Sequence, residues 1–200
     1  MLMKKAVLLL LSCCTYSIAS SQHLMYAIGS SYFIDHANHS KGITSSSIAF
    51  SPRYNITEHD YYSLSVGLPI NIGAVIDLRS SEDSYDYNYT DKIRMLIDVP
   101  VILNFNLGAI SSAENTQKVG GFVGAGMAYH LGPVTKIRKG QNGIDDYNPT
   151  TQGSAGPVIN AGIRLNIRQA GINGLEIKGT YMKSYINQTD VYSIQLLYAM

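Results

Sequence analysis

A strict period of two runs through residues 95–107 and limits what this chain can fold into. The odd positions of this stretch are all apolar, while the even positions include Asp98, Asn104 and Asn106. Because successive side chains of a β-strand point to opposite faces, the pattern predicts a strand with one apolar and one polar face. A soluble strand usually has about five or six residues, whereas a bilayer-crossing strand needs roughly nine to eleven. This strand is therefore long enough to cross a membrane.

The same alternation recurs along the chain, with no helical periodicity between the repeats. An even number of strands without intervening helices favours direct antiparallel pairing. We therefore predict an all-β fold, an eight-stranded antiparallel up-and-down transmembrane β-barrel. We expect a local bulge or bend at Pro100, because proline has no N–H to donate to the backbone hydrogen bonds between neighbouring strands. The expected strands cover residues 24–34, 43–54, 60–72, 95–107, 119–131, 159–168, 175–181 and 192–200.

The connectors between these strands differ in length. Residues 55–59, 108–118 and 169–173 form short or moderate turns, whereas residues 78–91 and 133–154 form long loops. Outer-membrane barrels have this asymmetry, with short periplasmic turns and longer external loops. We therefore expect both termini in the periplasm and the two long loops outside the cell.

Alternation alone also fits a soluble lipocalin-like binding barrel, which would turn its apolar face inward. The residues on the polar face distinguish this barrel from one whose apolar face touches lipid. The polar face carries charges of both signs, which can pair inside a narrow lumen but would each cost several kcal/mol in lipid. Tyrosines near strand ends on the apolar face indicate an aromatic girdle: Tyr32, Tyr54, Tyr62, Tyr129, Tyr181 and Tyr198. We predict a lumenal, ion-paired polar network that plugs the barrel, made of Arg53, Asp98, Asn104, Arg164, Arg168, Glu176 and Lys178.

The N-terminus reads as a signal peptide. Lys4 and Lys5 precede an apolar run and small residues, so we predict a cleaved segment at residues 1–21 and a barrel domain at residues 22–200. An alternative is a lipoprotein signal with lipidation at Cys13. Cleavage at Gln22 removes both cysteines and leaves 13 Lys and Arg against 14 Asp and Glu, a net charge of about −1. This excludes thiol chemistry and argues against a nucleic-acid partner.

Several polar residues in the loops are candidates for a metal, catalytic or ion-binding site. His36 and His39 have a spacing that could bind a metal, but a solvated loop explains them better. His130 faces the predicted lumen, and a Ser-His-acid site would need a geometry that sequence does not give. The acidic cluster Glu82, Asp83 and Asp86 could bind ions that bridge lipopolysaccharide, although loop solvation is simpler. Residues 145–148 lack an EF-hand spacing. We expect no catalytic residue, metal or cofactor.

Two segments resemble a known group. Residues 97–103, Ile-Asp-Val-Pro-Val-Ile-Leu, and residues 120–126, Gly-Gly-Phe-Val-Gly-Ala-Gly, are similar to strands of the PorT-like outer membrane protein beta-barrel domain group of the Bacteroidota. Gln22 at the cleavage point fits the same group, which shares the architecture of OmpA- and OmpX-type barrels. The C-terminus departs from it, because Met200 stands where such barrels usually end on an aromatic residue.

These observations predict a non-enzymatic protein of a bacterial cell outer membrane. Its role would be structural, adhesive or interacting through the external loops, with outer-membrane lipid and lipopolysaccharide around it and a protein partner at loops 78–91 and 133–154. The resemblance implies a PorT-like component of a secretion or assembly complex as a narrower alternative. A lipid-modifying outer-membrane enzyme and the soluble binding barrel are the remaining alternatives.

Overall fold

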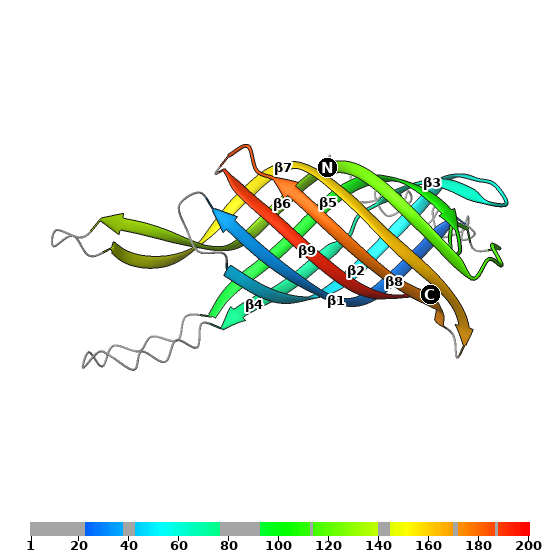
Figure 1. The fold of residues 1–200 in the computed structure, drawn as a ribbon, viewed down its shortest axis with the longest axis horizontal. Coiled ribbons are helices and arrows are strands. Elements are labelled where there is room, and N and C mark those ends of the chain that lie inside the picture. The colour runs from blue at the N-terminus through cyan, green and yellow to red at the C-terminus, as the bar shows by residue number, and fades with distance from the viewer. Residues whose placement is uncertain are drawn as a thin grey trace, which may run out of the picture.

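One antiparallel sheet closes on itself in the described part of the chain (Figure 1). The structure is a computed structural model that describes residues 23–37, 43–76, 93–112, 114–139, 145–169, 172–186 and 188–200. Within these residues the strands are β1 (Leu24–Ala37), β2 (Ile43–Glu58), β3 (Tyr62–Gly67), β4 (Ile70–Ile76), β5 (Ile93–Gly108), β6 (Val119–Lys139), β7 (Asp145–Gln169), β8 (Ile172–Lys183) and β9 (Thr189–Ala199). The described residues contain no helix suited to spanning a membrane.

Strand pairing gives a ring of eight positions. Apart from β3 and β4, strands that follow one another in sequence pair with each other, and β1 also pairs with β9, which closes the ring. Both β3 and β4 lie between β2 and β5, so together they fill one position. The predicted eight-stranded antiparallel up-and-down barrel is therefore confirmed. We call the end at which the chain enters β1 and leaves β9 the terminal end, and the opposite end the loop end.

The predicted irregularity at Pro100 lies in the neighbouring strand instead. β5 is continuous and pairs with β6 without a register shift, with Pro100 opposite Ala128. On its other side, β5 pairs through Ile102 with the end of β3 and through Asp98 with the start of β4. The gap at residues 68–69 thus faces Pro100, and Pro69 and Pro100 lie across from each other. A residue without an N–H is tolerated there because the ladder is already interrupted.

Several predicted strand ends were wrong. The predicted loop 133–154 is largely paired, because β6 and β7 continue in register as far as Lys139 and Asp145 and project as a hairpin (Figure 1). β1 also runs on through Ala37 and β2 through Glu58, into segments expected to be connectors. The other predicted long loop, residues 78–91, lies outside the described residues.

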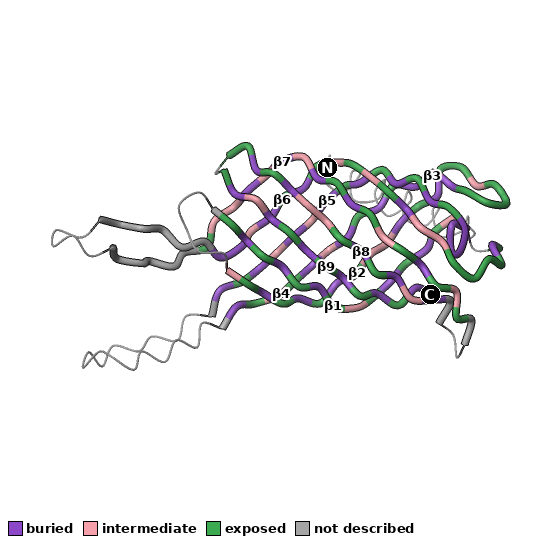
Figure 2. Tube along the Cα trace, in the orientation of Figure 1, coloured by how far each residue is buried: buried purple, intermediate pink, exposed green. Residues whose placement is uncertain are grey.

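The two faces of the wall follow the predicted alternation, with exposed and buried residues in turn along each strand (Figure 2). On the outside, Val101 is 52% and Leu103 48% exposed, while Asn104 on the opposite face of the same strand is buried. The apolar exterior covers every position of the ring, and Tyr32, Tyr54, Tyr62, Tyr129 and Tyr198 of the predicted girdle are exposed on it. The soluble lipocalin-like alternative is wrong, since that barrel requires the opposite orientation.

The interior is less polar than predicted. Near the terminal end, Met25 and Leu197 pack with the turn that follows β5. Nearer the loop end, a second cluster of inward-facing apolar side chains fills the lumen: Phe33, Leu96, Ile102, Ala128, Val158, Met182 and Val191. The barrel therefore has two small hydrophobic cores. Polar side chains of the lumen lie between them.

We expect the exterior to tolerate apolar but not charged substitution. Met127 is 55% exposed and pairs with Val101 on β5. Met127→Arg should lower the unfolding free energy in phospholipid vesicles by about 2–4 kcal/mol, since an outward charge near the bilayer midplane must leave lipid or disturb it. Met127→Leu is the matched control and should change it by less than about 1.5 kcal/mol. Urea unfolding followed by tyrosine fluorescence measures both, and equal stability of the two variants would contradict the lipid-facing orientation.

Candidate functional site

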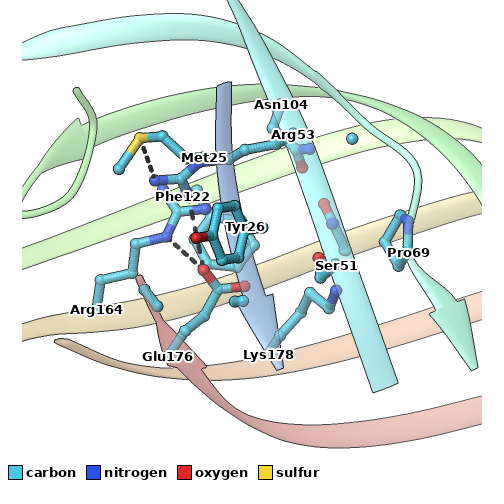
Figure 3. Close-up of a pocket in the computed structure, with 14 residues that line it drawn as sticks. Met25, Tyr26, Ser51, Arg53, Pro69, Asn104, Phe122, Arg164, Glu176 and Lys178 are labelled. Atoms are coloured by element: carbon cyan, nitrogen blue, oxygen red, sulfur yellow. Dashed lines mark hydrogen bonds and ion pairs between the residues drawn. The ribbon is translucent and has the colours of Figure 1, made fainter. Parts of the chain in front are cut away.

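The inward side chains of three strands converge on one carboxylate near the middle of the lumen (Figure 3). Arg164 on β7 pairs in register with Glu176 on β8, and its Nε donates to Glu176 Oε2 at 2.6 Å. The guanidinium of Arg53, on β2, lies 3.8 Å from the same oxygen. Arg164 also stacks over the Phe122 ring at 4.0 Å from its centroid. We call Arg53, Arg164 and Glu176 the arginine–glutamate cluster.

A chain of amide and hydroxyl groups extends this cluster toward the terminal end. Arg164 donates to Asn106 Oδ1 at 2.8 Å. The amide nitrogen of Asn106 then donates to Ser65 Oγ at 2.9 Å and to Ser63 Oγ at 3.1 Å. These side chains are buried, so each hydrogen bond replaces one that the group would make with water. The network joins β3, β5, β7 and β8 across the lumen.

The connector after β5 folds into the barrel instead of lying over its rim. Residues 109–112 and 115, which we call the inner turn, are buried. The carbonyl of Ile110 accepts a hydrogen bond from Arg53, and that of Ser111 accepts from Asn55 at 2.9 Å and from Ser63 at 2.6 Å. Ile110 has a φ of 58°, which is strained for a β-branched residue. These tertiary hydrogen bonds hold the strained conformation in place.

A small cavity adjoins the arginine–glutamate cluster. Its volume is about 20 Å³, and its wall includes Asn104, Asn160 and Lys178 together with the three residues of the cluster (Figure 3). Lys178 is only 2% exposed, although it carries an ammonium group. Three of the four charged side chains that line this cavity are therefore cations.

A second polar group lies nearer the loop end and centres on a histidine. His130 on β6 contacts two carboxylates, with Nε2 3.0 Å from Asp35 and Nδ1 3.2 Å from Asp98. Asn71 donates to the other oxygen of Asp98 at 2.9 Å and accepts from Ser31 at 2.8 Å. We call Asp35, Asp98 and His130 the histidine cluster. Its members come from three strands, so it also ties β1, β5 and β6 together.

The structure divides the predicted network in two. Arg53, Arg164 and Glu176 are in contact, and Asn104 and Lys178 share their cavity. Asp98 belongs to the histidine cluster instead. The side chain of Arg168 lies outside the described residues. The predicted network left out further members of the two groups, although the period-two pattern places each of them on the inward face: Ser31, Asp35, Ser63, Ser65, Asn71, Asn106 and His130.

The other candidate residues do not form a reactive site in the described part of the chain. Both ring nitrogens of His130 already face carboxylates, so the ring has no nitrogen left to activate a serine. His36 is exposed on β1. His39 and the acidic residues Glu82, Asp83 and Asp86 lie outside the described residues, as do the side chains of residues 145–148. No three His, Cys, Asp or Glu residues are arranged to hold a metal ion in the described ranges.

Comparison with solved structures identifies the fold. The chain is similar to Ail, the attachment invasion locus protein of Yersinia pestis, with a TM-score of 0.51 and 12% identity over 90% of this chain and 99% of that one. A structure of Ail in complex with the heparin analogue sucrose octasulfate gives 0.50, at 12% identity over 89% and 98%. Neisserial surface protein A also gives 0.50, at 11% identity over 88% and 96%.

These similarities establish a shared barrel fold. No family model matches the chain, and no curated protein matches it in sequence.

Loss of the central carboxylate should weaken the barrel strongly. Glu176→Gln leaves the guanidinium groups of Arg53 and Arg164 buried together without a counter-charge, which we expect to cost about 3–5 kcal/mol of unfolding free energy. The matched control is Glu58→Gln at the terminal end. Glu58 pairs with His23, whose side chain is 42% exposed, so this change should cost less than about 1 kcal/mol. Denaturant titration of both variants in the same detergent compares them, and similar losses would mean that the cluster contributes no special stability.

Proposed function

We propose that this chain is a non-enzymatic β-barrel protein of a bacterial outer membrane, with both termini in the periplasm and its contacts made by the external loops. The observation that carries the proposal is the apolar exterior, which runs around a closed ring of strands while Arg53, Glu176 and Lys178 are buried inside. A surface of this kind is stable in hydrocarbon and would aggregate in water. A bacterial protein with an antiparallel barrel of this size and polarity belongs in the outer membrane.

A lumen that does not conduct is part of the proposal. Eight strands leave an interior that side chains can fill. Here the inner turn lies inside the terminal end, the arginine–glutamate cluster crosses the middle, and Phe33, Leu96 and Met182 pack nearer the loop end. These three layers support a structural, ion-paired plug of the predicted residues. A lumen filled in this way would lack the continuous water path that conduction requires.

The external loops supply the interaction surface in this proposal. Residues 78–91 contain three tyrosines, one arginine and four acidic residues, including Glu82, Asp83 and Asp86. The Ail structure holds a sulfated ligand, but an acidic loop of this kind would repel sulfate. The loop suits a basic protein surface, or divalent ions that bridge it to lipopolysaccharide, and tyrosine favours protein contact. The β6–β7 hairpin projects from the barrel and would add a further contact surface.

A place in a secretion or assembly complex is the narrower form of the same proposal. It rests on the resemblance of residues 97–103 and 120–126 to the PorT-like group of the Bacteroidota. Lipid-modifying activity is the contrasting form. It would need a nucleophile or a water activated by a base, and both ring nitrogens of His130 already face carboxylates.

Reconstitution tests the closed lumen. In planar bilayers the folded protein should produce no discrete conductance steps, because the inner turn and the arginine–glutamate cluster block the bore. A large open porin reconstituted in the same way serves as the positive control. Reproducible ion-conducting steps from the wild-type protein, scaling with salt concentration, would show that the lumen is an open pore.

Loop replacement tests the interaction role. Residues 78–91 are exchanged for a Gly/Ser linker of equal length in a protein displayed on a bacterial surface. The variant should still fold, as judged by faster gel migration before boiling, because loops outside the sheet tolerate replacement. Adherence of the displaying cells to cultured cells should fall to the level of the empty vector. Unchanged adherence, or none with the wild-type protein, would exclude an adhesive role for this loop.

A further inference from the structure

The charges around the lumenal cavity do not balance. Arg53, Arg164 and Lys178 line it with three cations, whereas Glu176 is the one carboxylate among the lining residues, so the formal excess is two positive charges. All four side chains are buried inside the barrel. Burying an uncompensated charge costs far more than burying a paired one, so a site of this kind favours a bound counter-ion.

Glu176 is already committed to the two arginines. Its Oε2 accepts from Arg164 at 2.6 Å and faces Arg53 at 3.8 Å. Lys178, two residues further along β8, makes no hydrogen bond or ion pair with another described side chain. Its ammonium lies on the cavity wall, where the carboxylates of Glu176 and Asp98 act on it only from a distance (Figure 3).

The nearest other carboxylates are engaged elsewhere in the barrel. Asp98 faces His130 at 3.2 Å and accepts from Asn71 at 2.9 Å. Glu58 lies at the terminal end, where it contacts His23 at 3.3 Å and accepts from Asn55 at 2.7 Å. Neither carboxylate lines the cavity, so Asp98 and Glu58 act on its cations only from a distance.

The size of the cavity selects the kind of ligand. The cavity is small, with a volume of about 20 Å³, but it has room for a particle the size of a water molecule. A chloride ion is only slightly larger than a water molecule, whereas sulfate or phosphate has five heavy atoms. We propose that the cavity binds one monatomic anion of chloride size, held by the ammonium of Lys178 and the guanidinium groups of Arg53 and Arg164.

Two amides on the wall complete the site. Asn104 and Asn160 each have a buried carbonyl oxygen without a hydrogen-bond partner among the described residues. The amide nitrogen of Asn104 makes only a 3.5 Å contact with the carbonyl of Ile102. An amide turned through half a rotation occupies the same space and exchanges its oxygen for an N–H donor. An anion in the cavity selects this orientation and gains the donors.

Thermal unfolding in different salts tests the site in the folded, detergent-solubilised protein. Sodium chloride is compared with sodium gluconate at equal ionic strength, because gluconate screens charge equally but is too large to enter. At a chloride concentration ten times the dissociation constant, the folded-to-unfolded ratio should be about 11-fold higher than in gluconate. Equal unfolding in the two salts would overturn the proposal.

A matched pair of variants locates the effect. Lys178→Met removes the cavity ammonium and should abolish the difference between chloride and gluconate. Lys183→Met removes an exposed lysine from the same strand and should preserve it. A chloride effect that persists in Lys178→Met would overturn the proposal, because the ion would then act elsewhere.

Bromide provides a test that needs no variant. Crystals of the wild-type protein grown in sodium bromide should show an anomalous scattering peak inside the cavity, in contact with Lys178. If the cavity shows ordinary water density without anomalous signal at saturating bromide, it holds only water and the anion site is excluded.

Discussion

Hydrogen bonding of the backbone in lipid is the constraint on which this structure depends. No water is available in the hydrocarbon layer, so every N–H and C=O of a spanning strand must find its partner in the sheet. An open sheet would leave two edges unpaired, and the pairing of β1 with β9 removes them. The amide of Met200 still donates to the carbonyl of Tyr26 at 2.9 Å, so the seam is bonded up to the last residue.

Closure of a small ring then determines the contents of the interior. The inward side chains face one another across a narrow space from which most water is excluded, so polar groups there must satisfy one another. Arg164, Glu176 and Asn106 do this with direct hydrogen bonds. Room for such groups requires small neighbours. A Cβ added to Gly124 would lie 2.2 Å from Asn104 Oδ1 and 2.6 Å from Asn160 Oδ1, so this glycine makes space for both amides.

The sequence predicted the strands and their two faces well because both depend on local order. Period two is a property of neighbouring residues, and it placed Leu103 outside and Asn104 inside correctly. The strand ends were harder to predict, because polar composition alone made Asp35 look like part of a connector. Asp35 is in fact the inward partner of His130, 95 positions further along the chain. The alternation continues through it, and following period two a few residues further would have included it.

The division of the site into two clusters was predictable, whereas the inner turn was not. Asp98 and Asn104 are six residues apart on one strand, which is about 20 Å at 3.4 Å per residue, so they could not belong to one contact group. The inner turn depends on the carbonyl of Ser111 meeting Asn55 and Ser63, which are about fifty residues away in sequence. A polar turn that folds inward and one that stays in water have the same composition. Only the positions of the facing side chains distinguish them.

The proline gap shows how the backbone constraint and the cavity are related. Prolines in spanning strands remove donors that lipid does not replace, and here Pro69 and Pro100 face each other across a single interruption between β3 and β4. The amide of Leu68 beside this gap still donates to Pro52 O at 3.0 Å, so the segment between β3 and β4 remains hydrogen-bonded to β2. Pro69 and Gly67 also line the cationic cavity. The ladder is therefore interrupted beside buried cations and amides. Such polar groups can form hydrogen bonds with backbone groups that have no partner in the neighbouring strand.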